Sequence, residues 1–209
     1  MTKELFLGAL KELRKEEKKG FVQSLDLIVN LAELDLRKEN IAVFLSLPNK
    51  FKENKICAFL EAKSPLVDRT ITKAEITAIE KKNLKKIAKE HEFFISSASL
   101  MPSVAGTFGK ILGPLGKMPN PKFGGVVMKE DASIIKATVD KFRNALSIKA
   151  KEMSLKASIG KEDMTDAQLA ENADAAYNAI LNALPRKKDN IKSVMIKFTM
   201  SKPVRLNIK

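Results

Sequence analysis

The sequence predicts an α+β outer domain, an antiparallel sheet with helices, interrupted by an inserted α/β domain of Rossmann type. Two observations carry this prediction. Apolar and polar residues alternate near both ends of the chain, as in a sheet with one face in water. Between them, short continuously apolar runs alternate with helical patterns, as in a parallel sheet covered on both faces. We therefore expect the outer domain at residues 1–51 and 150–209, and the inserted domain at residues 52–149.

The outer domain is expected to consist of two helices and several half-exposed strands. Thr165 and Gln168 have the spacing of a capping box that begins the second helix, and Pro185 ends that helix. The expected elements are a helix at 6–19, strands at 21–31 and 41–47, a strand at 153–159, a helix at 165–184 and a hairpin at 194–208.

The inserted domain is expected to alternate buried strands with helices. Thr72 and Glu75 make a second capping box, and the lysines between 81 and 89 lie off the apolar stripe of that helix, as a solvated face would. The expected elements are a strand at 56–60, a long helix at 72–89, a strand at 93–95, a helix around residue 100, a loop at 106–125, a strand at 126–128 and a helix at 132–144.

The charge of the chain points to a polyanionic partner. It carries 38 Lys and Arg against 25 Asp and Glu, a net charge of +13. RNA, DNA and an anionic membrane are the candidates, but no apolar run reaches the length of a membrane span and no signal peptide opens the chain, so we expect a cytoplasmic protein. Aromatic residues make up only 6% of the chain. This favours binding of structured RNA over binding of single strands, whose unpaired bases stack on aromatic side chains.

Few residues are available for catalysis or metal binding. Cys57 is the single cysteine and His91 the single histidine, so a zinc cluster of the usual kind cannot be built. Cys57 lies in an apolar run and is expected to be a buried, inert thiol. We predict no catalytic residue, no metal site and no cofactor.

Residues 106–125 hold six of the nine glycines, together with three prolines and with Lys110 and Lys117, and no acid occurs from 93 to 129. Glycine lets backbone approach a ligand closely, and lysines suit phosphate, so the alternative function is a phosphate-handling enzyme that uses this loop. The segment lacks both the Walker pattern and the dinucleotide fingerprint. Its G-x-x-G at residues 113–116 also matches the short pattern of KH domains.

The whole run GKILGPLGKMPNPK at residues 109–122 closely resembles the signature of the ribosomal protein L-one family, which forms the mobile lateral stalk of the large subunit. The resemblance covers nearly the whole chain and looks archaeal. It extends to Phe21, residues 46–48, the run GKEDM at 160–164, and residues 193–205.

The resemblance implies a non-enzymatic, RNA-binding ribosomal protein that is monomeric off the ribosome. Its implied partners are large-subunit rRNA, exit-site tRNA whose release it assists, and its own mRNA, whose translation it represses. Carried over by position, the RNA-binding residues are Phe21, Ser24, Asp26, Ser193, Thr199, Met200 and Ser201. Secondary RNA contacts are expected at Lys19, Lys202, Arg205, Lys110 and Lys117.

Two positions depart from the usual family pattern. Ser201 stands where the family usually has glycine, and Gly20 stands where it usually has a basic residue. The side chain of Ser201 would occupy a place where backbone approaches RNA closely. We therefore expect either a displaced hairpin or a compensating hydroxyl contact with RNA.

Overall fold

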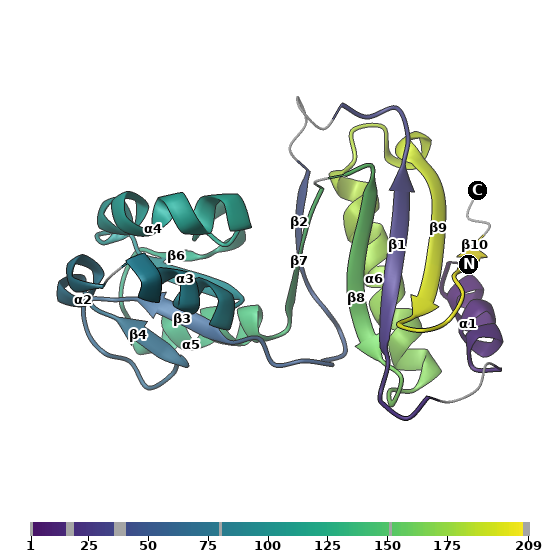
Figure 1. Ribbon diagram of the computed structural model, residues 1–209, viewed down its shortest axis with the longest axis horizontal. Coiled ribbons are helices and arrows are strands. Elements are labelled where there is room, and N and C mark those ends of the chain that lie inside the picture. Colours follow the sequence, from purple (N-terminus) through teal and green to yellow (C-terminus); the bar gives the residue numbers. More distant parts are fainter. Residues whose placement is uncertain (1, 16–18, 36–40, 80, 151, 207–209) are drawn as a thin grey trace. The chain divides into compact units, whose positions relative to one another are not determined.

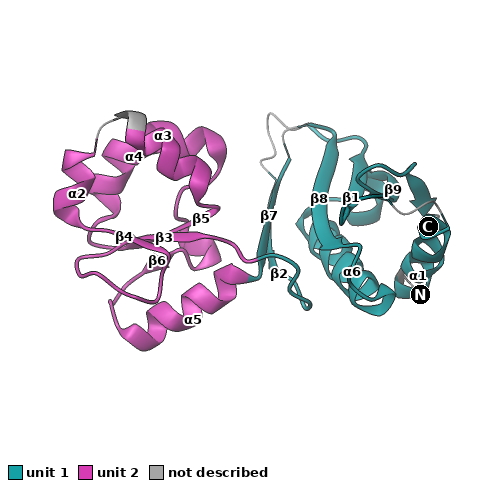
Figure 2. Ribbon diagram, turned by 60° about the horizontal axis from the view of Figure 1, so that its bottom comes forward, with its two compact units in different colours: residues 1–52, 144–209 teal, residues 53–143 magenta. Residues whose placement is uncertain are grey.

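The computed structural model describes residues 2–15, 19–35, 41–79, 81–150 and 152–206 (Figure 1). The chain divides into two compact units. Unit 1 comprises residues 1–52 and 144–209, and unit 2 comprises residues 53–143 (Figure 2). Each unit has its own sheet, antiparallel in unit 1 and parallel in unit 2, so the predicted mixture of two sheet types with helices is confirmed.

Unit 1 is built on a four-stranded antiparallel sheet in the order β10-β9-β1-β8. The two central strands, β1 and β9, come from opposite ends of the chain. Buried and partly exposed residues alternate along them, as the sequence predicted. The strands are β1 (Ser24–Leu31), β8 (Ser154–Lys161), β9 (Ile191–Phe198) and β10 (Val204–Leu206).

Two helices, α1 (Thr2–Leu13) and α6 (Asp166–Ala183), cover one face of this sheet (Figures 1 and 2). The core between helices and sheet contains Phe6 and Leu10 of α1, Leu27 of β1 and Ile196 of β9. The predicted capping box begins α6, because Thr165 and Gln168 exchange hydrogen bonds of 3.2 and 3.4 Å. Helix α1 ends at Leu13 rather than near residue 19, and residues 16–18 lie outside the described part of the chain.

A separate two-stranded sheet, β2 (Ala42–Ser46) with β7 (Ala145–Lys149), also belongs to unit 1. The expected boundary at 149/150 therefore differs from the division at 143/144. The sequence analysis missed β7 because its five residues directly follow a helix and lack a turn signal of their own. A short helical turn, η2 (Lys187–Asn190), precedes β9.

Unit 2 contains a parallel sheet in the order β4-β3-β5-β6. Helices α2, α3 and α4 cover one face and α5 covers the other (Figure 2). All four residues of β3 are buried, as predicted for a doubly covered strand. Its elements are β3 (Ile56–Phe59), β4 (Arg69–Ile71), α2 (Lys73–Ala78), α3 (Lys81–Glu90), β5 (Phe93–Ser97), α4 (Met101–Leu115), η1 (Pro121–Phe123), β6 (Val126–Val127) and α5 (Ala132–Arg143).

The single long helix expected at 72–89 is wrong, because the structure has two helices there, α2 and α3. The Thr72 backbone N–H donates to Glu75 Oε2 at 3.1 Å, as the capping box predicts, but the helix stops where Ile79 adopts an extended backbone. The apolar spacing of Ile76, Ile79 and Leu84 runs across this break without a glycine or proline. Sequence periodicity alone therefore does not reveal it.

The loop expected at 106–125 is also wrong over its first half, because residues 106–115 are the second part of α4. Gly106, Gly109 and Gly113 lie on this helix, and a Cβ at each would meet nothing within 4 Å. Gly116 ends the helix with a left-handed φ of 71°, as a glycine commonly does. The glycines therefore do not form one continuous phosphate loop.

Candidate nucleic-acid interface

Two segments from opposite ends of the chain meet at the end of the unit 1 sheet where β1 begins and β9 ends. Thr199 Oγ1 accepts a hydrogen bond from the Ser24 N–H at 3.2 Å and donates to the Ser24 carbonyl at 3.4 Å. The Met200 N–H donates to Gln23 Oε1 at 3.0 Å. We call residues 21–24 and 199–201 together the platform.

The platform presents apolar side chains to solvent. Phe21 is 52% exposed, Val22 58% and Met200 65%. Large apolar side chains are seldom exposed as a group without a partner. Met200 is therefore not part of the sheet core.

Gln23 supports the platform, and the sequence analysis did not identify it. It is only 5% exposed, and it holds the turn at Met200 through its side-chain oxygen. Its carbonyl accepts from the Glu162 N–H at 2.8 Å, and its N–H donates to Glu162 Oε2 at 3.3 Å. A signal was present, because Gln23 occupies an inward position of the alternating pattern where an apolar residue is expected.

Ser201 closes the turn between β9 and β10. Its hydroxyl accepts from the Phe198 N–H at 2.8 Å and lies 3.3 Å from the carbonyls of Phe198 and Lys202. Among described non-glycine residues, only Glu33 and Lys187 have a positive φ, so the backbone at 201 does not require glycine. The described contacts of this hydroxyl lie within the hairpin.

Asp26 lies beside the platform on the open face of the sheet, paired in register with Ser158 of β8 and Lys197 of β9. Burial raises the pKa of the Asp26 carboxyl, while the Lys197 charge and the Ser158 hydroxyl oppose the increase. A carboxyl between a lysine and a hydroxyl can accept hydrogen bonds from ribose hydroxyls while Lys197 offsets its charge.

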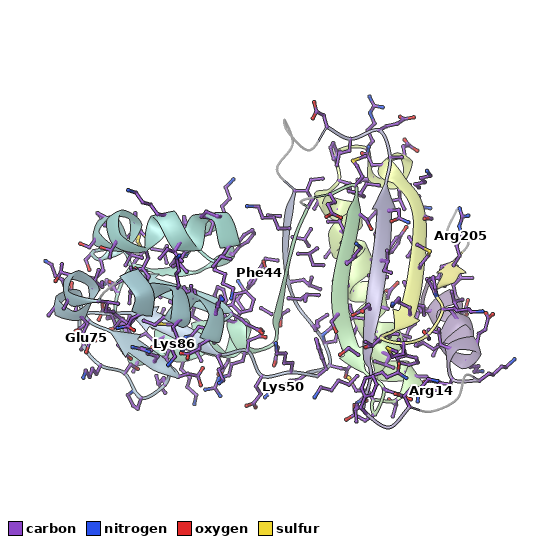
Figure 3. The ribbon with its side chains drawn as sticks, in the orientation of Figure 1. Arg14, Phe44, Lys50, Glu75, Lys86 and Arg205 are labelled. Atoms are coloured by element: carbon purple, nitrogen blue, oxygen red, sulfur yellow. The ribbon has the colours of Figure 1, made fainter. Side chains whose placement is uncertain are left out.

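Exposed cations lie near the platform and along the same sheet. Lys19 and Lys202 are exposed and flank the two platform segments in sequence. Arg205 is exposed on β10, opposite Met195 in register, part-way along β9 from the platform (Figure 3). Lysine and arginine beside an apolar surface are suited to phosphate contacts.

Ser193 is not part of this cluster. It pairs with Asn30, at the far end of β9 from Thr199, and its hydroxyl accepts from Asn30 Nδ2 at 2.9 Å. Of the seven residues predicted to bind RNA, the structure thus brings Phe21, Ser24, Asp26, Thr199, Met200 and Ser201 together and places Ser193 apart.

Lys110 and Lys117 lie in unit 2 and differ in their surroundings. Lys110 is exposed on α4. Lys117 Nζ donates to the carbonyls of Ala88 at 2.9 Å and His91 at 2.8 Å, at the C-terminal end of α3. A lysine at this position stabilises the free carbonyls and the negative end of the helix dipole. Lys117 is therefore a structural residue in this fold.

Comparison with known proteins decides the family. The family model described as the Ribosomal protein L1p/L10e family matches residues 13–202. The chain belongs to this family. Because L1p/L10e proteins are structural, the prediction that the chain is not an enzyme is confirmed.

Individual L1p/L10e relatives match over nearly their full length. The chain is 37% identical over 218 residues to the large ribosomal subunit protein uL1 of Methanothermococcus thermolithotrophicus, covering 99% of both chains. It is 37% identical over 210 residues to that of Thermococcus kodakarensis, covering 95% of this chain and 94% of the relative. It is 34% identical over 206 residues to that of Nanoarchaeum equitans, covering 94% and 97%. The expected archaeal resemblance is thereby confirmed.

Among the described residues of this L1p/L10e member, no helix combines the length and the apolar character that a membrane span needs. Within the same ranges, no group of three or more His, Cys, Asp or Glu side chains is arranged to hold a metal ion.

Replacing Asp26 by asparagine should change the pH dependence of unit 1 stability. A carboxyl whose pKa is higher in the folded state stabilises that state when protonated, and the contribution is lost as pH rises through the folded pKa. The free energy of unfolding of the unsubstituted protein should therefore fall relative to Asp26→Asn as pH rises from about 3 to 6. Urea unfolding followed by the fluorescence of Tyr177, the single tyrosine, reports on unit 1. Asp163→Asn, at an exposed position, is the control. If the difference in free energy of unfolding between the unsubstituted protein and Asp26→Asn did not change with pH, the expectation would be contradicted.

Replacing Lys117 by methionine should increase the population of unit 2 molecules that are transiently unfolded, and it should leave RNA affinity unchanged. Loss of the bonds to Ala88 and His91 should cost about 1–2 kcal/mol, or about a 5- to 30-fold larger open population. Cys57 is fully buried in β3 and burial raises its thiol pKa to about 12, so its labelling rate reports on opening. Lys110→Met on α4 is the control. Equal labelling rates in the two variants would refute a structural role for Lys117.

Proposed function

We propose that the chain is a structural constituent of the large ribosomal subunit and that unit 1 binds rRNA of the lateral stalk. Three relatives that it matches over nearly their full length are named large ribosomal subunit proteins. The net charge of +13 suits a polyanionic partner. On this account the protein acts in the cytoplasm, on the ribosome, and is monomeric away from it.

The platform is the observation that carries the proposal. Hydrogen bonds between residues 175 positions apart in sequence fix its two segments before any ligand arrives. Preorganised surfaces lose little conformational entropy on binding. Exposed Phe21 and Met200 offer apolar contact area, Lys202 supplies charge beside it, and Arg205 adds a cation further along the same sheet. Folded RNA presents this combination of base or ribose surface and phosphate.

The hydroxyls within the platform have a supporting role in this proposal. Thr199 and Ser201 use their hydroxyls within the chain, so they shape the turn that presents Met200. Each hydroxyl oxygen keeps a second lone pair that ribose can use. We therefore propose the backbone and apolar side chains as the principal RNA contacts, with Asp26 and Ser24 beside them.

The remaining roles rest on the family resemblance. We propose that the protein assists release of exit-site tRNA and represses translation of its own mRNA. We also propose that unit 1 is the RNA-binding domain and that unit 2 is inserted into it. Unit 1 comprises both ends of the chain, which is the arrangement that an insertion produces.

Sedimentation and RNA binding test the ribosomal role together. A tagged copy of the full chain should sediment with large subunits and resist washing in moderate salt. The purified chain should prefer protein-free large-subunit rRNA over small-subunit rRNA by about 100-fold or more at matched salt. Equal affinity for the two RNAs, or a chain confined to ribosome-free fractions, would overturn the proposal. Addition of the chain to an extract translating its own message tests repression separately.

A further inference from the structure

Helix α3 in unit 2 carries a concentration of positive charge that the platform does not use. Five of its ten residues are lysine, against a single acid, Glu90. Leu84, Ile87 and Ala88 are buried, so α3 is anchored by one apolar stripe. Lys85, Lys86 and Lys89 are exposed on the outer side of the helix.

A cavity of about 310 Å³ adjoins this lysine face. It is formed where α3 passes the end of α2 and the start of β4. Its lining combines two cations, one amide, one carboxylate and two apolar side chains: Arg69, Lys86, Asn83, Glu90, Ile79 and Ile87. Lys86 is labelled on α3 in Figure 3.

Within the described ranges, the two cations of the cavity have weak ion pairing or none. Among the described residues, no carboxylate forms an ion pair with Arg69, which is exposed at the start of β4. Lys86 Nζ lies 3.9 Å from Glu90 Oε1, and the two side chains are 76% and 44% exposed. Such a long, exposed pair contributes little and leaves the ammonium available to an anion.

We propose that this cavity and the lysine face of α3 form a second RNA-binding surface, which holds the phosphodiester backbone of a structured RNA. The Arg69 guanidinium and the Lys86 ammonium would bind one phosphate at the cavity. The Asn83 amide can donate to a phosphate oxygen or accept from a ribose hydroxyl, and Ile79 and Ile87 form an apolar floor for the ribose.

The extent of the charge favours a polymer over a small anion. Lys85 and Lys89 stand one helical turn apart, about 5–6 Å along the axis, and both lie outside the cavity lining. A linear chain of phosphates can meet the cavity and these lysines in succession. A free phosphate would occupy the cavity and leave the outer lysines without a role.

A triple variant with a matched control tests this surface in the full chain. Arg69→Gln/Lys86→Gln/Lys89→Gln removes three charges from it. The control Lys122→Gln/Lys129→Gln/Lys136→Gln removes three charges from exposed positions on η1, after β6 and on α5, the helix that covers the opposite face of the unit 2 sheet (Figure 2). The probe is a fluorescently labelled RNA duplex of about 12 base pairs, whose backbone supplies phosphates without single-stranded bases.

The first variant should weaken duplex binding about tenfold or more at 0.1 M salt and lower the salt slope by about 2 to 3, while the control changes affinity less than about twofold. Equal losses in both variants would mean diffuse electrostatic attraction and would overturn the proposal. If the first variant lost affinity for inorganic phosphate but not for the duplex, the cavity would be a small-anion site, and the RNA proposal would be wrong. Thermal unfolding of both variants checks that the fold is kept.

Repeating the comparison in a Met200→Glu background separates this surface from the platform. If the platform proposal fails, Met200→Glu has no effect on rRNA binding, but the α3 variant still loses duplex affinity. If the α3 proposal fails, the α3 variant and its control behave alike in both backgrounds.

Discussion

Replacing Met200 by glutamate is expected to weaken binding to large-subunit rRNA by about 100-fold. Met200 is 65% exposed at the tip of the platform, so an RNA partner would cover a large apolar side chain there. Losing that burial costs about 1–2 kcal/mol, and a carboxylate facing phosphate adds repulsion of similar size. Together these correspond to about two decades in the dissociation constant. Fluorescence anisotropy at fixed salt measures the change.

Met153→Glu is the matched control for this substitution. Met153 is also in unit 1 and is 40% exposed, but it lies beside Leu31, at the far end of β1 from the platform. The same change of charge should alter rRNA affinity less than about threefold, because no RNA contact is proposed there. Similar losses in the two variants would mean that Met200 has no particular part in binding.

Replacing Asn172 by leucine is expected to lower the free energy of unfolding of unit 1 by about 3 kcal/mol. Asn172 is fully buried on α6. Its Oδ1 accepts from the Asn49 N–H at 2.9 Å, and its Nδ2 donates to the carbonyls of Asn49 at 2.8 Å and Ile159 at 2.9 Å. Leucine has a similar volume but satisfies none of these groups, so three backbone polar groups lose a partner.

Urea unfolding followed by Tyr177 fluorescence measures this loss, because the single tyrosine lies on the same helix. Asn178→Ala is the control, since Asn178 is exposed on α6 and, among the described residues, its Nδ2 donates to Asp174 alone, at 3.1 Å. It should cost less than about 1 kcal/mol. If the two variants unfolded at the same urea concentration, the Asn172 network would not support unit 1 as described.

Local patterns predicted most of the secondary structure because the residues that start and stop these elements act locally. The Thr165 capping box begins α6 where expected, and alternation of apolar residues located β1, β8 and β9. Strand β7 was missed because it follows α5 closely and its buried and exposed residues do not alternate strictly, so no local pattern marked it as a strand.

The glycine-rich segment shows where composition misleads. Glycine is permitted rather than required at Gly106, Gly109 and Gly113, and tertiary packing of Val104, Phe108 and Leu112 holds that segment helical. The segment was therefore a strong family signature and a poor guide to backbone conformation.

The candidate site was predictable in part. Periodicity indicated that Asp26 lies on the open face, and the family resemblance added Phe21 and Met200. Ser193 lies apart from Thr199 because of the strand register. The Lys117 ammonium binds the end of α3 because of the way α3 and α4 pack. Neither feature follows from sequence spacing. Gln23 was missed although it could have been predicted, because a buried polar side chain needs a hydrogen-bond partner.

Crosslinking of the full chain to RNA in cells, read at residue resolution, tests the central claim most directly. Adducts to large-subunit rRNA are expected within residues 19–26 and 197–205, with Phe21 and Met200 among the modified residues. Adducts that occur elsewhere in the chain but nowhere in these two segments would contradict the assignment of the platform as the rRNA-binding surface.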